Sequence, residues 1–197
     1  MSAATGDLSL EQFILETNRL GTGAMSLSEF ATLAVRLELD DALVGAHVRF
    51  DDAHYARNLL CRTPQFELLV LCWRPGQAST VHDHAGSLNV TRVYRGTLVQ
   101  RKFSRRDGGP GTTRLDQAES GELPCGPVEQ IEEEVFAGAG SATVDRGDIH
   151  QLRNDSDESL VTVHLYAPPL TDIVVYSLTA ATTEVMRLRY TLQDDFA

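Results

Sequence analysis

Apolar residues recur along this chain at two different spacings. In the first 50 residues they recur every three or four positions, which predicts amphipathic helices. One face of the first helix is formed by Leu10, Phe13, Ile14 and Leu20, and its N-cap would be Ser9 or Asp7. Ser26 and Glu29 form a capping-box pattern ahead of a second apolar face, made by Phe30, Leu33, Ala34 and Leu37. A short third helix would begin at Asp40.

Beyond this region the pattern changes to short apolar or alternating runs separated by Gly, Pro and Asp, which is typical of β-strands. The segment Tyr55–Leu60 is interpreted as the approach to a first strand at Phe66–Trp73. Further strands are expected at Ser79–His84, Asn89–Tyr94, Thr97–Phe103, Gln130–Phe136, Ser141–Val144, His150–Asn154, Ser159–Ala167, Ile173–Ser177 and Glu184–Tyr190. Asp107–Pro127, rich in Gly and Pro, is expected to be a loop. Many short strands without intervening helices predict a sandwich or barrel.

The length of 197 residues fits a single domain, with residues 1–50 as a helical addition and residues 65–190 as the β-rich part. Apolar residues make up 42% and charged residues 23%, as in ordinary soluble proteins. The longest apolar run, Leu68–Trp73, is far shorter than the ~20 residues of a membrane span. The N-terminus lacks a basic region followed by an apolar core, so no secretory signal is expected.

The charge balance narrows the range of partners. There are 28 acidic and 17 basic residues, giving a net charge of -11, which argues against nucleic acid or an anionic membrane as the main partner. The basic cluster Arg101–Arg106 is interpreted as a solvated hairpin end rather than a binding patch. Cys61, Cys72 and Cys125 are widely spaced with no C-x-x-C pair, which predicts free thiols in a reducing cytoplasm, with Cys72 in the core. The chain is expected to be a monomer.

Two histidines one residue apart, His82 and His84, are the first candidate for chemistry. In a strand both point to one face while Asp83 points to the other, so the two imidazoles could clamp a transition metal. The alternative is a pair of surface histidines without a ligand. A third histidine, His150, follows a turn at Gly147. Imidazole ligands suit iron, zinc, copper or nickel, and a set of three histidines could also hold a hydrolytic zinc.

These two segments resemble the paired metal-binding motifs of the cupin superfamily. The first motif is matched by Gly76, His82, His84 and Gly96. The second is matched by Gly147, His150 and Asn154, with Asp145 at its usual proline position. The usual glutamate is absent, since Leu88 and Asn89 occupy its place. The resemblance implies a mainly β fold, a jelly-roll-like cupin β-barrel with N-terminal helices.

Further stretches narrow the resemblance to thiol dioxygenases of the cysteine dioxygenase type. They are Tyr55-Ala-Arg57-Asn58-Leu, Leu71-Cys72-Trp73, His82-Asp-His84 and His164-Leu-Tyr166-Ala-Pro-Pro, which together span roughly Tyr55–Pro169. The resemblance implies an enzyme that oxidises L-cysteine with O2 to cysteine sulfinate. Its Fe(II) cofactor would be held by His82, His84 and His150.

The same resemblance implies roles for other residues. Arg57 would hold the substrate carboxylate, for which a planar guanidinium is well suited, and Tyr55 would line the substrate pocket. The family has a relay of a tyrosine, a histidine and a serine that lies outside the metal ligands. It is matched here by Tyr166, His164 and Thr162, with Thr162 in place of the usual serine. These three alternate onto one face of a strand. Trp73 matches a tryptophan that packs under the relay.

Asn89 departs from the family pattern, which has cysteine in animal members and glycine in many bacterial ones. No thioether to Tyr166 can form, and the Asn89 amide would donate to the tyrosine oxygen or to a bound ligand. Arg57 favours cysteine, because relatives acting on 3-mercaptopropionate typically carry glutamine there. Another small carboxylated thiol, such as 3-mercaptopropionate or mercaptosuccinate, and a non-catalytic metal-binding cupin remain alternatives. We interpret His47 and His54 as structural.

Overall fold

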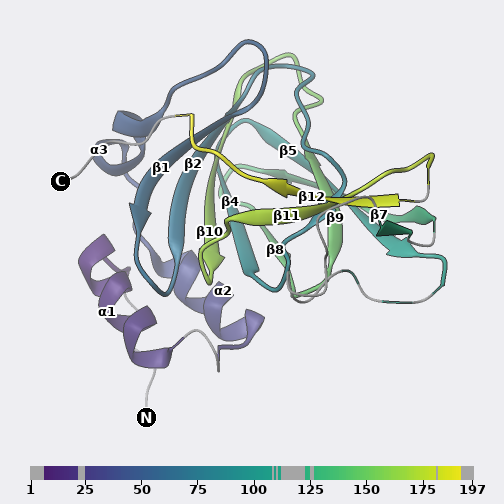
Figure 1. Cartoon of the computed structure of the whole chain (residues 1–197). Coiled ribbons are helices and arrows are strands. Elements are labelled where there is room, and N and C mark those ends of the chain that lie inside the picture. The colour runs from purple at the N-terminus through teal and green to yellow at the C-terminus, as the bar shows by residue number, and fades with distance from the viewer. Residues whose placement is uncertain are drawn as a thin grey trace.

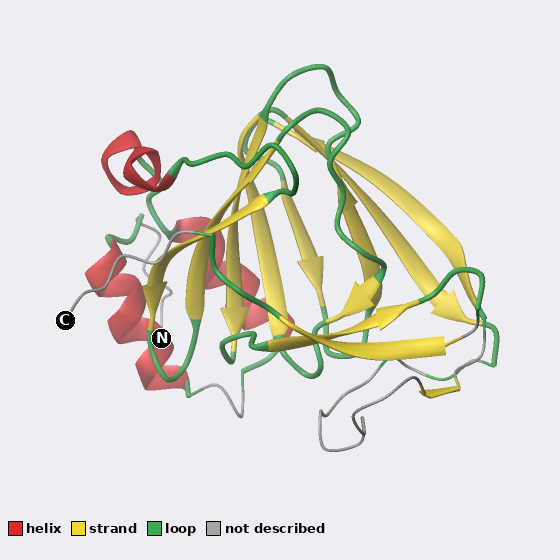
Figure 2. Cartoon of the chain, turned by 45° about the horizontal axis from the view of Figure 1, so that its top comes forward, coloured by secondary structure: helices red, strands yellow, loops and turns green. Residues whose placement is uncertain are grey.

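Two antiparallel β-sheets face each other, with helices packed on one side (Figures 1 and 2). The computed structural model describes residues 7–21, 25–107, 109, 111, 123–124, 127–180 and 182–191. Among these residues the sheets remain separate, so the expected barrel is an open, two-sheet jelly roll. The predicted mainly β cupin fold with N-terminal helices is confirmed.

The strands are shared unequally between the sheets. The first sheet has the order β1-β2-β10-β4-β8, formed by Ala56–Arg62, Glu67–Trp73, Leu160–Ala167, Leu88–Arg95 and Ser141–Val144. The second has the order β6-β12-β11-β3-β9-β5-β7, formed by Leu123–Pro124, Thr182–Arg187, Asp172–Tyr176, His82–Asp83, Ile149–Arg153, Thr97–Arg105 and Val128–Ala137.

Every expected strand is present, with ends shifted by a few residues. The largest change is at Ser79–His84, where only His82–Asp83 pair as β3. Two strands were not expected. Tyr55–Leu60 was interpreted as an approach to a strand, but most of it belongs to β1 itself. The expected loop Asp107–Pro127 lies largely outside the described residues, and within it β6 pairs with β12.

The helices are α1 (Leu10–Leu20), α2 (Leu27–Arg36) and α3 (Asp41–Val44), followed by a 3-10 turn at Gly45–His47. Ser9, not Asp7, caps α1, and Ser26 forms the expected capping box with Glu29 on α2. Leu20 lies about two turns after Phe13 on the same face, and it is 43% exposed because it is in the last turn of α1. No described helix has the length and apolar character needed to cross a membrane.

Strand β2 is buried on both faces, which explains its uninterrupted apolar run. One face packs against the helices, where Phe13 meets Phe66 edge-to-face at 5.2 Å between ring centroids. The residues of β2 on that face are Leu68, Val70 and Cys72. The residues facing the space between the sheets are Leu69, Leu71 and Trp73. Cys72 is therefore a core residue, as expected.

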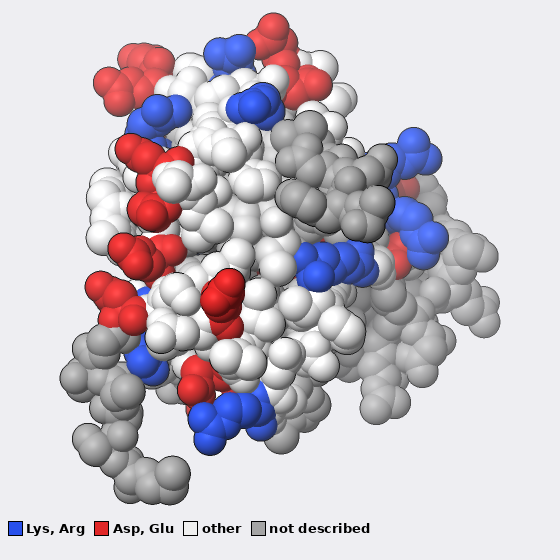
Figure 3. Space-filling view, turned by 90° about the vertical axis from the view of Figure 1, so that its left-hand side faces the viewer, with Lys and Arg blue, Asp and Glu red and all other residues white. Residues whose placement is uncertain are grey.

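The basic cluster Arg101–Arg106 covers the last residues of β5, at the end of its antiparallel pairing with the acidic strand β7. Arg101 contacts Glu133 at 2.7 Å, and Lys102 contacts two further glutamates at 2.9 Å. These pairs are partly exposed and contribute little individually. On the face that bears α1 and α3, acidic and basic side chains are interspersed, and its described residues form no continuous basic surface (Figure 3).

Candidate metal centre and polar relay

Three buried histidines from different parts of the chain converge in the second sheet. His82 in β3 pairs directly with His150 in β9, and His84 follows in the turn after β3. One nitrogen of each ring lies within 4.8 Å of the others, and the Nε2 atoms of His84 and His150 are 3.0 Å apart. All three side chains are buried. The sequence pattern therefore identified three residues that do meet in space.

Asp83 faces away from this cluster, as its position between the two histidines predicts. Its carboxylate accepts hydrogen bonds from the Tyr176 hydroxyl at 2.6 Å and from the Ala85 backbone at 2.8 Å. Ala85 has a φ of 48°, so this contact supports a backbone conformation that is unusual for alanine. Asp83 thus stabilises the turn that places His84 beside the other two rings.

The three imidazoles are in the protonation state that metals require. Burial lowers the pKa of His82 to about 4 and those of His84 and His150 well below the ordinary value. His82 Nδ1 donates a hydrogen bond to the Thr80 carbonyl at 2.9 Å, so the lone pair on its Nε2 atom remains available for a metal. Three neutral imidazoles without a carboxylate fit a divalent transition metal such as iron.

A cavity of about 680 Å³ extends to Thr80, the residue whose carbonyl contacts the His82 ring. Arg57, on β1, lines it and is only 7% exposed. The Nε and Nη2 atoms of this guanidinium have no hydrogen-bond partner among the described residues. Tyr55 also lines the cavity, and its ring stacks on Trp73 at 4.2 Å between centroids. The cavity therefore presents a desolvated cation to any ligand that enters it.

The three residues of the expected relay alternate along β10 onto the interior face of the first sheet. Thr162 Oγ1 lies 2.8 Å from His164 Nε2, and the Tyr166 hydroxyl lies 3.2 Å from His164 Nδ1. Trp73 Nε1 donates to Thr162 Oγ1 at 2.9 Å, so it bonds to the relay as well as packing under it. The Tyr166 ring meets His84 edge-on at 5.1 Å between centroids, which connects the relay to the metal-ligand cluster.

Burial raises the pKa of the Tyr166 hydroxyl, although the nearby Arg57 guanidinium opposes this shift. Burial also lowers the pKa of His164 well below its ordinary value. At neutral pH, Tyr166 is therefore a protonated phenol and His164 a neutral imidazole.

The Asn89 amide bonds to the backbone and not to the Tyr166 oxygen, so that part of the expectation was wrong, while donation to a bound ligand stays a prediction. Its Nδ2 donates to the Leu165 carbonyl at 3.1 Å, because β4 and β10 are adjacent strands. Its Oδ1 accepts from Thr91 at 3.0 Å, and Thr91 Oγ1 also lies 3.1 Å from His164 Nδ1. Sequence reasoning missed Thr91, since a threonine in a strand is ordinary and only the register places it opposite His164.

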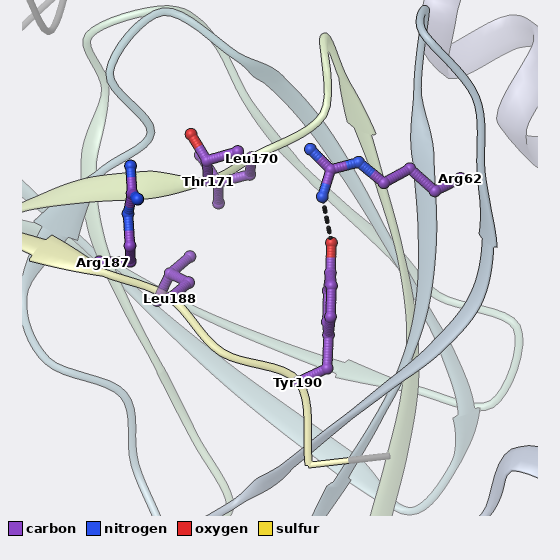
Figure 4. Close-up of a pocket in the computed structure, with 6 residues that line it drawn as sticks. All are labelled: Arg62, Leu170, Thr171, Arg187, Leu188 and Tyr190. Carbon is purple, nitrogen blue, oxygen red and sulfur yellow. Dashed lines mark hydrogen bonds between the residues drawn. The ribbon is translucent and has the colours of Figure 1, made fainter. Parts of the chain in front are cut away.

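Three C-terminal residues, Arg187, Arg189 and Tyr190, divide between two pockets. Arg189 lines the large cavity, together with His54. Arg187 pairs with Asp172 at 3.1 Å and lines a smaller pocket of about 220 Å³ that Tyr190 also borders. In Figure 4 the Tyr190 hydroxyl reaches Arg62 on the opposite wall of this smaller pocket.

The model of the family described as Cysteine dioxygenase type I matches residues 22–179, most of the chain. The chain belongs to the cysteine dioxygenase type I family. A curated relative, cysteine dioxygenase type 1 of Homo sapiens, is 26% identical over 147 residues, covering 74% of this chain and 66% of the relative. The Danio rerio protein of the same name is 31% identical over 123 residues, covering 61% and 55%. The chain thus spans two thirds or less of the length of these relatives.

Among solved structures, this cysteine dioxygenase family member is similar to a crystal structure of a Thermus thermophilus protein, at 22% identity and a TM-score of 0.48. That match covers 68% of this chain and 99% of the other. A Klebsiella pneumoniae protein with a double-stranded beta-helix domain matches at 18% identity and a TM-score of 0.44, covering 64% and 86%.

Proposed function

We propose that this chain is a non-haem iron thiol dioxygenase that oxidises L-cysteine with O2 to cysteine sulfinate. The observation that carries the proposal is a cluster of three buried neutral imidazoles within electrostatic reach of the buried Arg57 guanidinium, whose Nε and Nη2 atoms have no hydrogen-bond partner among the described residues. The first group is a ligand set for a transition metal, and the second is a site for an anionic end of the substrate. Membership in the cysteine dioxygenase type I family supports the same reaction class.

In this proposal His82, His84 and His150 hold Fe(II). When bound, the iron supplies the redox chemistry that lets dioxygen react with a thiolate. The ligand set carries no negative charge, which favours an anionic sulfur as the incoming group. Because the three histidine side chains are buried, electrostatic interactions at the cluster are stronger than they would be in water.

Arg57 orients the substrate by binding its carboxylate. The guanidinium has already lost its water on folding, so a carboxylate satisfies donors that are otherwise left unpaired. Tyr55, fixed by its stack on Trp73, forms one wall of the same cavity. Tyr166 keeps its proton at neutral pH and is therefore placed to donate a hydrogen bond rather than to act as a base.

A second candidate substrate class is favoured by the size and charge of the cavity. A volume of about 680 Å³ exceeds what L-cysteine needs, and the exposed Arg189 lines it as well. A thiol with a second carboxylate, such as mercaptosuccinate, could bind both arginines. L-Cysteine and 3-mercaptopropionate carry only the carboxylate that Arg57 would bind.

The test is an oxygen-uptake assay on the chain loaded anaerobically with Fe(II). The thiols are L-cysteine, 3-mercaptopropionate, mercaptosuccinate and cysteamine, which lacks a carboxylate. We expect the highest kcat/KM for L-cysteine, with both atoms of labelled dioxygen in the sulfinate product. A higher kcat/KM for mercaptosuccinate would instead support the second class. Binding of iron without oxygen uptake for any thiol would identify a non-catalytic metal-binding cupin and overturn the proposal.

Substitutions of the proposed iron ligands test whether oxygen uptake depends on the histidine cluster. His82→Ala and His150→Ala should each abolish both stoichiometric iron binding and oxygen uptake. His47→Gln is the matched control, because the His47 ring contacts the Leu43 carbonyl, away from the cluster. Equal losses in all three variants would contradict the assignment of the metal ligands.

A further inference from the structure

The buried polar chain from Asn89 to Trp73 has a hydrogen-bonding direction that is set at its Asn89 end. At the first end, Asn89 Nδ2 lies 3.1 Å from the Leu165 carbonyl, which can only accept. This contact sets the orientation of the amide, so its Oδ1, which can also only accept, faces Thr91 Oγ1 at 3.0 Å. Thr91 must therefore give its single hydroxyl proton to Asn89.

This donation determines what Thr91 can do at its other contact. With its proton committed to Asn89, Thr91 Oγ1 can only accept from His164 Nδ1, 3.1 Å away. The hydrogen of the neutral His164 ring is therefore on Nδ1, and Nε2 carries the lone pair.

The contacts at the opposite end of the chain are compatible with the same tautomer. Trp73 Nε1 can only donate, and it donates to Thr162 Oγ1 at 2.9 Å. Thr162 can then direct its own hydroxyl proton to His164 Nε2, 2.8 Å away. All of these side chains are buried, so water does not offer alternative partners.

We propose that Thr91, oriented by Asn89, is a positioning residue that holds His164 in its Nδ1–H tautomer and so directs the Tyr166 hydroxyl proton toward the metal-ligand cluster. Since Nδ1 carries a hydrogen, the Tyr166 oxygen at 3.2 Å can only accept from it. In the other tautomer Tyr166 would donate to His164, and its proton would point away from the cluster. The tautomer is inferred from the contacts of Thr91, whereas its benefit to catalysis rests on the proposed dioxygenase function.

The tautomer can be measured without iron or substrate. In the full chain labelled with 15N-histidine and kept metal-free, long-range 1H–15N correlation spectra distinguish a protonated from an unprotonated ring nitrogen. The His164 signals are assigned as those missing from His164→Gln. We expect protonated Nδ1 and unprotonated Nε2 at pH 7. Protonated Nε2 in the unmodified chain would overturn the proposal, whatever reaction the protein catalyses.

Thr91→Val and Thr91→Ser separate the role of the hydroxyl from that of side-chain volume. Valine removes the acceptor at nearly constant shape, so the Nε2–H form should become populated, while serine should keep the Nδ1–H form. An unchanged tautomer in Thr91→Val would contradict the role of Thr91. If Thr91→Val fails to fold, Asn89→Ala serves instead, because it frees the Thr91 proton to donate to Nδ1 and should shift the same equilibrium.

The effect of Thr91 on catalysis is measured by steady-state kinetics of the iron-loaded chain. Thr91→Val should lower kcat by about tenfold or more with KM little changed, and Thr91→Ser should restore kcat, as expected for misdirected proton donation. If the unmodified chain shows no dioxygenase activity, the proposed function fails while the spectra still decide the tautomer. If the tautomer shifts but kcat does not, the proposed link between Thr91 and proton delivery is wrong.

Discussion

At the scale of single residues, Arg57 is the buried side chain whose hydrogen bonding would change most when a ligand binds. A buried guanidinium with two unpaired nitrogens is costly to the folded state, and a bound carboxylate offsets that cost. Function and stability should therefore respond in opposite directions when this charge is removed.

We expect Arg57→Gln to raise KM for carboxylated thiols by about 10- to 100-fold, because hydrogen bonds to a charged group contribute roughly 1.5–3 kcal/mol. The KM for cysteamine should change little, and the free energy of unfolding of the ligand-free chain should not fall. Steady-state kinetics and urea unfolding measure the two quantities. Arg95→Gln, at the exposed end of β4, is the control. A large loss of stability would show that Arg57 is structural.

Single residues also show which parts of the candidate site could be predicted from the sequence. The positions of His82, His84 and His150 were predictable, because spacing within a strand and paired turns bring imidazoles to one face. The environment of Asn89 was not, since its partners depend on the register between β4 and β10. Thr91 carried no signal at all, because its importance comes only from lying opposite His164.

At the scale of elements, the pattern of each strand reflects what covers its two faces. β2 was easy to predict because both its faces are buried, which produces a continuous apolar run. β1 was missed because it is an edge strand whose Arg57 and Asn58 interrupt the apolar alternation. Polar residues within a strand were thus interpreted as the end of regular structure, although Arg57 is buried and lines the large cavity.

The capping box of α2 gives a prediction about the helical layer. Ser26 Oγ accepts from the Glu29 backbone at 3.3 Å, and Glu29 accepts from the Ser26 backbone at 2.9 Å. Ser26→Ala should lower the free energy of unfolding by about 1 kcal/mol. Ser28→Ala, in the exposed first turn of the same helix, should change it by less than about 0.5 kcal/mol. Urea titrations with unchanged m-values would measure both, and equal effects would contradict a capping role.

The segment after β12 is attached to β2 through one tyrosine. The Tyr190 hydroxyl donates to the buried Glu67 carboxylate at 2.7 Å and accepts from Arg62 at 2.7 Å. Burial and the neighbouring Glu67 raise the pKa of Tyr190 to about 12, so the donor is retained at neutral pH.

Tyr190→Phe leaves Glu67 short of one hydrogen bond and should reduce the free energy of unfolding by about 1–3 kcal/mol. Tyr94→Phe is the control, because the Tyr94 hydroxyl bonds only the exposed Asp41 among its described contacts. Urea unfolding should show the smaller loss for Tyr94→Phe. The reverse order would mean that Tyr190 does not anchor this segment.

At the scale of the whole molecule, the helices and the candidate site lie on different sides of the first sheet. The helical core contacts the outer face of β2 and β10, whereas the relay occupies their inner face. Changes in the helical layer should therefore alter stability with little effect on the site. The strand pattern left a sandwich or a barrel open, because short strands without helices fit either architecture, and only the pairing between strands distinguishes two sheets from one closed sheet.

The buried histidines make the stability of the metal-free chain depend on pH. His82, His84, His150 and His164 all have a pKa below the ordinary value of about 6.5, because burial disfavours their charged forms. Below about pH 6.5 the unfolded chain binds protons at these sites and the folded chain does not. The free energy of unfolding should therefore be highest above pH 6.5 and fall as the pH decreases. Each histidine can contribute a slope of up to about 1.4 kcal/mol per pH unit.

Urea unfolding of the metal-free chain between pH 7.5 and 5.5 measures this slope while avoiding the range in which most carboxylates titrate. For His82, whose pKa is about 4, the folded group stays neutral across this window. His82→Gln should make the slope shallower, whereas His54→Gln, at an exposed position, should leave it unchanged. A divalent metal competes with protons for the same nitrogens, so its stabilising effect should also be larger at pH 7.5 than at 5.5. A metal effect independent of pH would mean that the ion binds elsewhere.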